Sequence, residues 1–123
     1  MAESESLRRF GAHQKALALF DGVVADLAPL VSAPVLQRLI SQQLASADSI
    51  AANIEEGHGR GSKRDYAHFL IIARGSAQET RGRYQRIKHW LSPEGIAPRV
   101  ALCDEIIAML TATISTLREQ DRE

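Results

Sequence analysis

Three breaks divide this 123-residue chain into four long segments, and they constrain its fold more than any other feature. Two of the breaks are pairs of prolines, Pro29 with Pro34 and Pro93 with Pro98. The third is the glycine-rich stretch at residues 57–62. Proline and clustered glycine both interrupt helices and favour turns. We therefore expect four elements joined by short connections.

Each segment between the breaks repeats apolar residues every three, four or seven positions, which is the spacing of one helix face. The predicted helices cover about residues 6–28, 35–56, 63–91 and 97–119. The apolar stripe of the first predicted helix consists of Phe10, Leu17, Phe20, Val24 and Leu27, and that of the second consists of Leu36, Ile40, Leu44, Ala47, Ile50 and Ile54. The stripe of the third consists of Tyr66, Phe69, Ala73, Thr80, Tyr84, Ile87 and Leu91. The stripe of the fourth consists of Val100, Cys103, Ile107, Leu110, Ile114 and Leu117. Four amphipathic helices with short loops predict an all-α protein, an antiparallel up-down-up-down four-helix bundle that forms one domain over residues 1–123.

Composition narrows the class of protein. Hydrophobic residues make up 45% and charged residues 24%, as in a soluble globular protein. Fifteen basic residues balance fifteen acidic ones, which excludes a strongly basic nucleic-acid binder of the histone kind but leaves room for a basic face. With a single cysteine, no intrachain disulfide can form. No segment reaches the roughly 18 apolar residues that span a bilayer, so we expect a cytoplasmic protein.

The third predicted helix has apolar residues outside its core stripe. On a helical wheel Ile71 and Ile72 lie away from that stripe, so residues 69–73 are apolar on nearly all sides. Gly75 and Gly82 lie near Ile71, and each glycine costs about 1 kcal/mol in a helix interior. Close approach of another backbone would offset that cost. We therefore predict an oligomer interface here, the alternative being a solvated helix face with a lone exposed isoleucine.

Positive charge is concentrated in the same part of the chain. Residues 58–91 hold eight basic and two acidic residues, a net charge of +6. Lys63, Arg74, Arg81 and Lys88 fall on one flank of the third predicted helix and form a row about 37 Å long. Such a row could follow a nucleic-acid backbone through phosphate contacts. The alternative is a solvated flank, or ion pairs with acidic residues of a neighbouring helix or subunit.

The glycine-rich break lies next to further cations. It differs from a phosphate-binding P-loop because the lysine follows the serine and no strand precedes the loop. A turn between two helices is its simplest interpretation. Glycine-rich backbone beside a helix N-terminus, with Arg60, Lys63 and Arg64 nearby, could also hold an anion. Ser62 is a suitable N-cap for the helix that follows.

Two motifs have the spacing of metal-binding carboxylates in helical bundles. Glu55-x-x-His58 and Asp65-x-x-His68 pair a carboxylate with a histidine three residues on. Both lie at helix ends, and periodicity brings no further set of carboxylates toward them. We therefore expect no metal and no cofactor.

No combination of residues indicates catalysis. Cys103 lies on an apolar stripe, which indicates a buried structural thiol rather than a nucleophile. His13 has no obvious partner in the sequence. Glu56 lies at the end of a predicted helix, where a cation such as Arg60 or Lys63 would neutralise it. We expect a protein that is not an enzyme.

Residues near the glycine-rich break resemble those of a known family. Gln43-Leu44, Ala47, Ser49-Ile50, Asn53-Ile54, Glu56-Gly57 and Gly59-Arg60 are similar to the signature of the 23S rRNA intervening sequence proteins. The similarity continues through Ser62, Phe69-Leu70, Ala73, Gly75-Ser76 and Glu79, and residues 14–17 resemble the family's opening motif. Ala45 and Ser46 depart from the family pattern, which usually has basic residues there.

The resemblance implies a four-helix bundle that assembles into a ring-shaped homopentamer. It implies a cytoplasmic bacterial protein without established catalysis. The accessory proteins of diversity-generating retroelements are similar, and they bind nucleic acid and a reverse transcriptase through a basic surface. For many members of the family the role is unknown.

Together these observations predict a non-enzymatic, oligomeric accessory protein that binds RNA or DNA, and possible partners include a nucleic-acid-processing protein. The predicted phosphate contacts are Arg60, Lys63, Arg64, Arg74, Arg81 and Lys88, and the predicted interface between copies is Ile71, Ile72, Gly75 and Gly82. The alternative is a purely structural oligomer, without affinity for nucleic acid, whose basic residues pair with acidic groups of its neighbours.

Overall fold

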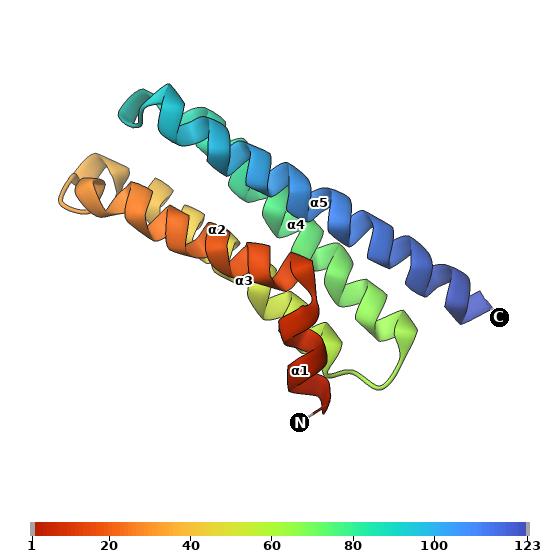
Figure 1. Cartoon of the computed structure of the whole chain (residues 1–123). Coiled ribbons are helices and arrows are strands. Elements are labelled where there is room, and N and C mark those ends of the chain that lie inside the picture. The colour runs from red at the N-terminus through yellow and green to blue at the C-terminus, as the bar shows by residue number, and fades with distance from the viewer. Residues whose placement is uncertain (1, 123) are drawn as a thin grey trace.

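The computed structural model describes the backbone of residues 2–122 and the side chains of residues 6–122. Every regular element in this part of the chain is helical, so the predicted all-α class is confirmed (Figure 1). The α-helices are α1 (Ala2–Arg9), α2 (Gly11–Leu27), α3 (Gln37–His58), α4 (Lys63–Ile87) and α5 (Pro93–Arg122). Two 3-10 turns, Ala28–Leu30 and Pro34–Leu36, lie between α2 and α3, and a third, Lys88–Trp90, lies between α4 and α5.

The breaks lie where the sequence places them, with two differences. The first predicted helix is in fact two, because Phe10 adopts an extended backbone between α1 and α2. Pro98 does not interrupt a helix, because it lies in the second turn of α5, where its missing N–H removes only one bond near the helix start. The predicted cap at Ser62 is confirmed, since its hydroxyl accepts a hydrogen bond from the Asp65 backbone N–H at 3.1 Å.

The helices enclose one apolar core. α4 packs against both α3 and α5, and α2 packs against the same two helices. Figure 1 shows α4 and α5 side by side, with α2 and α3 as a second pair. The start of α4, in green, and the end of α5, in blue, therefore lie at the same end of their pair.

The predicted core face of α2 is wrong in part. Leu17 and Val24 are 45% and 44% exposed, although both belong to the predicted stripe. Leu27 of that stripe is buried as predicted, and the other buried apolar residues of α2 are Ala12, Ala16, Leu19 and Val23. The small side chains of Ala12 and Ala16 allow neighbouring helices to approach closely, so the buried face is not the one with the largest side chains.

The other stripes are largely confirmed. On α4, Ala73, Thr80, Tyr84 and Ile87 are buried as predicted. The buried face of α4 is wider than the stripe because this helix packs between two others. Predicted core residues that are only partly buried are Leu44, Tyr66, Phe69, Leu91, Val100 and Ile107. Buried residues outside the predicted stripes include Gln43, Ser46, Ala51, Ala67, Leu70, Ser76, Ala77, Arg83, Ile96 and Ile106.

α5 differs from one expectation drawn from the sequence. Within the described residues it is long and apolar enough, by length and composition alone, to cross a membrane. In this structure Cys103, Ile106 and Leu110 are fully buried against the other helices of the bundle. Core helices of soluble proteins pass the same composition test, so one such helix is weak evidence for a membrane span.

Candidate nucleic-acid interface

The predicted row of cations on α4 faces α5. Arg74 Nη1 donates to Thr111 Oγ1 at 3.2 Å, and Arg81 Nε donates to Asp104 Oδ1 at 2.6 Å. These contacts place the middle of the row in the groove between the two helices. The Arg81–Asp104 ion pair neutralises one charge of the row within the same chain.

Cations from both helices gather at one end of this groove. Lys63 and Arg64 from the start of α4, with Arg118 and Arg122 from the end of α5, line a hollow of about 370 Å³. A second hollow beside it is lined by Arg74 together with Arg118 and Arg122. We call Lys63, Arg64, Arg74, Arg118 and Arg122 the basic cluster.

The basic cluster has few opposing charges. Only Asp121 lines the first hollow as a carboxylate, and only Glu119 lines the second. Among the side chains of residues 6–122, no carboxylate forms an ion pair with any member of the cluster. Apolar side chains share the first hollow with the cations, namely Ala67, Ile71 and Leu117. The site therefore combines positive charge with a partly apolar lining.

Sequence reasoning found three of the five residues of this cluster. Lys63, Arg64 and Arg74 were predicted, whereas Arg118 and Arg122 were not. The two missed residues lie four positions apart on the last turns of α5, on a helix that runs antiparallel to α4. These two residues join the cluster because the end of α5 packs beside the start of α4. The spacing of charges along α4 alone does not predict this packing.

Two other predicted phosphate contacts lie away from the cluster. Arg60 Nη2 donates to Glu56 Oε1 at 2.7 Å, and the guanidinium lies 4.8 Å from the centre of the Phe69 ring. The predicted pairing of Glu56 with a nearby cation is therefore confirmed. Lys88 lies at the other end of α4, where it lines a groove with His89. For these residues a role in phosphate binding stays a prediction.

The predicted oligomer interface is open in the single chain. Ile72 is 40% exposed, and Ile71, Gly75 and Gly82 are partly exposed. A Cβ atom built on Gly75 would meet no atom within 4 Å, and on Gly82 it would meet only Arg86 Nη1, at 3.8 Å. Ile71 also lines the hollow of the basic cluster, so it lies closer to α5 than the other three.

The first metal-like motif, Glu55 with His58, is engaged in other contacts. Glu55 Oε2 lies 2.7 Å from Nε2 of His13, a partner that the sequence did not indicate, and this contact joins α3 to α2. His58 Nδ1 lies 3.2 Å from the Tyr66 hydroxyl. Within residues 6–122, no three His, Cys, Asp or Glu side chains converge as metal ligands would.

Cys103 is fully buried, as predicted for a structural thiol. Burial, followed by the nearby Asp104 carboxylate, raises the pKa of this thiol to about 12. The thiolate, which is the reactive form, is therefore rare at neutral pH.

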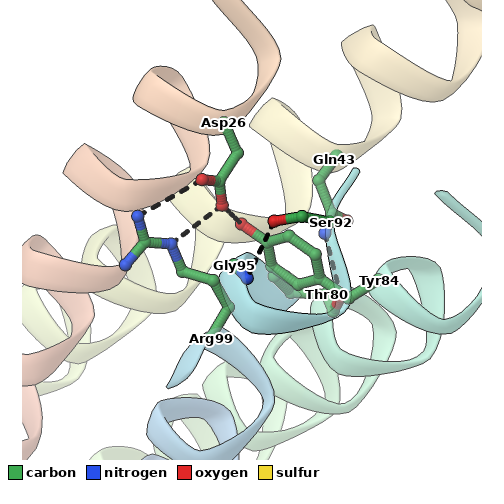
Figure 2. A network of polar contacts seen from close by, with 7 residues as sticks. All are labelled: Asp26, Gln43, Thr80, Tyr84, Ser92, Gly95 and Arg99. Carbon is green, nitrogen blue, oxygen red and sulfur yellow. Dashed lines mark hydrogen bonds and ion pairs between the residues drawn. The ribbon is translucent and has the colours of Figure 1, made fainter. Parts of the chain in front are cut away.

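A polar network holds the end of the bundle opposite the basic cluster (Figure 2). The Tyr84 hydroxyl donates to Asp26 Oδ2 at 2.7 Å, and Arg99 donates to both carboxylate oxygens of Asp26 at 2.8 and 3.3 Å. These contacts join α2, α4 and α5. Burial, followed by the hydrogen bond to Asp26, raises the pKa of Tyr84 above its usual value. The network locks the helices together, away from the cationic groove.

The fold and the groove define a small helical-bundle protein with a basic surface at one end of two antiparallel helices. A family model for the 23S rRNA-intervening sequence protein matches residues 9–112, which is most of the chain. The chain therefore belongs to this family, and the resemblance seen in the sequence is confirmed. No curated protein matches the chain significantly. Arg118 and Arg122 lie beyond the matched residues.

Proposed function

We propose that this protein is a non-enzymatic accessory protein that binds RNA or DNA through its basic cluster. The observation that carries the proposal is the convergence of five cations at one end of the α4–α5 groove, where Asp121 and Glu119 are the carboxylates among the described lining residues. Contacts between Lys or Arg side chains and phosphates provide the main part of nucleic-acid affinity. The cluster offers such contacts over neighbouring turns of two helices.

Helix electrostatics support the same proposal. Lys63 and Arg64 lie with Asp65 in the first turn of α4, at the positive end of the helix dipole, where a carboxylate is favourable and cations are unfavourable. Arg118 and Arg122 bring two more positive charges to the same place. A phosphate bound there would be attracted by all four side chains and by the backbone N–H groups of the helix start. An anionic partner thus relieves a repulsion that folding has built into this surface.

The remaining predicted contacts contribute less in this proposal. Arg60 and Arg81 are already paired with Glu56 and Asp104. Lys88 lies at the far end of α4 and could extend the contact along the groove. A nucleic acid would therefore be held mainly by Lys63, Arg64, Arg74, Arg118 and Arg122, and extra affinity would come from the others.

The test is the salt dependence of binding to a single-stranded RNA and to a DNA duplex, measured by fluorescence anisotropy. The test variant replaces Lys63, Arg118 and Arg122 by glutamine. The matched control replaces Arg8, Arg9 and Arg38, which are exposed cations on α1 and α3. Both variants lose three positive charges, so they differ only in where those charges stood.

Removal of three phosphate contacts should reduce the slope of log affinity against log salt by about 2 to 3. The control variant should keep the slope of the unmodified protein. If both variants lose affinity equally, binding depends on net charge alone and the basic cluster is the wrong surface.

We further propose that the chain folds as an up-down-up-down bundle and assembles into a homo-oligomer, a pentameric ring in the cytoplasm as its family resemblance implies. The exposed Ile72 and the open space at Gly75 support an interface on this face of α4. Light scattering after size exclusion gives the solution mass. Replacing Gly75 by arginine should reduce that mass while the helical content stays unchanged. An unchanged mass would place the interface elsewhere.

A structural scaffold without affinity for nucleic acid is the second candidate function. It is favoured by the ion pairs of Arg60 and Arg81, because these cations serve contacts within the protein. If no RNA or DNA binds even at low salt, the scaffold function stands and the accessory function is wrong.

A further inference from the structure

Arg83 is a buried cation on the other side of α4, facing α3. It is only 8% exposed. Its Nη1 atom donates to the Gln42 backbone oxygen at 3.2 Å, to Gln43 Oε1 at 2.9 Å and to Ser46 Oγ at 2.9 Å. A buried charge is costly unless it is paired. These three acceptors are neutral, so the charge of Arg83 is offset only in part, by the nearby Glu79 carboxylate.

The opposite edge of this guanidinium has no partner. All three hydrogen bonds use Nη1, whereas the buried Nε has no acceptor among the described residues. None of the ion pairs among the side chains of residues 6–122 includes Arg83. The N–H groups of Nε and Nη2 point in the same direction, and this edge of arginine binds two oxygens of a carboxylate or a phosphate.

Two hollows meet at Arg83. One, of about 540 Å³, is lined by Arg86 together with Gly75 and Gly82. The other, of about 350 Å³, lies between α3 and α4 and is lined by serines. Glu79 lines both hollows and is the one carboxylate among their lining residues. Gly75 and Gly82 leave the outer face of the larger hollow free of side chains, and both also belong to the proposed interface between copies.

The serine hydroxyls can serve as further donors. Ser49 Oγ accepts hydrogen bonds from Asn53 Nδ2 and from Ser76 Oγ, both at 2.9 Å. Because both of these bonds bring a hydrogen from the partner, the hydroxyl hydrogen of Ser49 is left for another acceptor. Arg83, Arg86 and Ser49 thus present two positive charges and several N–H and O–H donors around two hollows that share Arg83 and Glu79.

We propose that this pocket between α3 and α4 binds a small phosphate-type oxyanion, paired side-on with Arg83 and held by Arg86. A phosphate suits the site better than a carboxylate because it has more acceptor oxygens for two guanidinium groups and a hydroxyl. The site lies on the α3 side of α4, whereas the basic cluster lies on the α5 side. It extends beyond the proposed binding of nucleic acid and does not depend on it.

The test is a titration of the full chain with inorganic phosphate, followed by amide chemical shifts, with ionic strength held constant by sodium chloride. Arg86→Gln removes an exposed member of the site without touching the buried network. Arg83→Lys keeps the charge but removes the paired N–H edge. The matched controls are Arg38→Gln, another exposed cation, and the variant that lacks Lys63, Arg118 and Arg122.

We expect phosphate to shift amides around Arg83, Ser49 and Ser76, and its Kd to rise by about tenfold or more in Arg86→Gln and Arg83→Lys. Arg38→Gln and the triple variant should keep the Kd within about twofold. If Arg83→Lys fails to fold, Arg86→Gln decides alone.

Two results would overturn the proposal. One is a phosphate response that disappears in the triple variant but persists in Arg86→Gln, because phosphate would then occupy the basic cluster. The other is the absence of any phosphate response in the unmodified protein. A carboxylate of a second copy that already fills the site would also give this result, and the proposal would then be wrong. Neither result bears on whether the basic cluster binds RNA or DNA.

Discussion

The carboxylate of Asp26 should be the most costly single polar group to remove. Its side chain is 16% exposed and accepts hydrogen bonds from Tyr84 and Arg99, so it joins three helices. Asp26→Ala leaves the fully buried Tyr84 hydroxyl without a partner and the Arg99 charge unpaired. Breaking a fully buried ion pair costs about 3 to 5 kcal/mol. Because Arg99 is 28% exposed and water can reach it, we expect a loss of about 2 to 4 kcal/mol in the free energy of unfolding.

Tyr84→Phe separates the two parts of this loss. It removes one hydrogen bond to a charged acceptor, of a kind that contributes about 1.5 to 3 kcal/mol. Asp26 would still accept two bonds from Arg99, so no group is left unsatisfied. We therefore expect a loss near the lower end, about 1 to 2 kcal/mol.

Urea unfolding followed by circular dichroism measures both variants, at one protein concentration because assembly alters apparent stability. Glu105→Ala is the matched control. It removes a carboxylate from the exposed ion pair with Lys15, whose side chains are 40% and 57% exposed. That pair should contribute less than about 1 kcal/mol. If Asp26→Ala costs no more than Glu105→Ala, the reasoning about the buried network is wrong.

Three further predictions concern packing and titration. Gly75→Ala should raise the free energy of unfolding of the single chain by about 0.5 to 1 kcal/mol, because a Cβ there meets open space within a helix. Gly57→Ala should lower the free energy of unfolding by about 1 to 3 kcal/mol, because the added Cβ would lie 2.8 Å from Phe69 Cβ. In thermal melts the midpoints of the Gly75→Ala and Gly57→Ala variants should therefore shift in opposite directions. Cys103, with its pKa raised to about 12, should react with a thiol reagent at pH 8 at least about a hundredfold more slowly than in urea. Cys103 and Tyr84 both have a raised pKa in the folded state, so the unfolded chain releases these protons first as pH rises. The free energy of unfolding should therefore fall above about pH 9, by up to about 1.4 kcal/mol per pH unit for each group. In Cys103→Ser this fall should be shallower.

Local features of the sequence were sufficient for the helical fold. The prolines, the glycine-rich loop and the Ser62 cap act on the residues next to them, so their effect can be predicted without knowing what packs where. The core face of α2 could not be predicted in that way. It depends on how closely α3 and α5 approach Ala12 and Ala16. The larger apolar side chains elsewhere on the helix predict a different buried face.

The candidate site was predicted in part for the same reason. Charge spacing along one helix is local, which is why Lys63, Arg64 and Arg74 were found. The contribution of Arg118 arises only because α5 returns antiparallel to α4. The burial of Arg83 arises because α3 supplies acceptors for its guanidinium. Side chains with the same charge on one helix therefore differ in role according to the neighbour that each one faces.

The contacts that neutralise the positive charges of α4 connect the fold to the proposed function. The helix carries Lys63, Arg64, Arg74, Arg81, Arg83 and Arg86 within a chain of zero net charge. Folding satisfies part of this charge, because Asp104 pairs with Arg81 and the acceptors of α3 surround Arg83 on one side. At the start of the helix no described carboxylate forms an ion pair with Lys63 or Arg64, and α5 brings Arg118, Asp121 and Arg122 to the same hollow. An ion pair within the chain therefore neutralises Arg81 in the middle of the helix, whereas the proposed anionic partner would bind at the helix start, where such pairs are missing among the described residues.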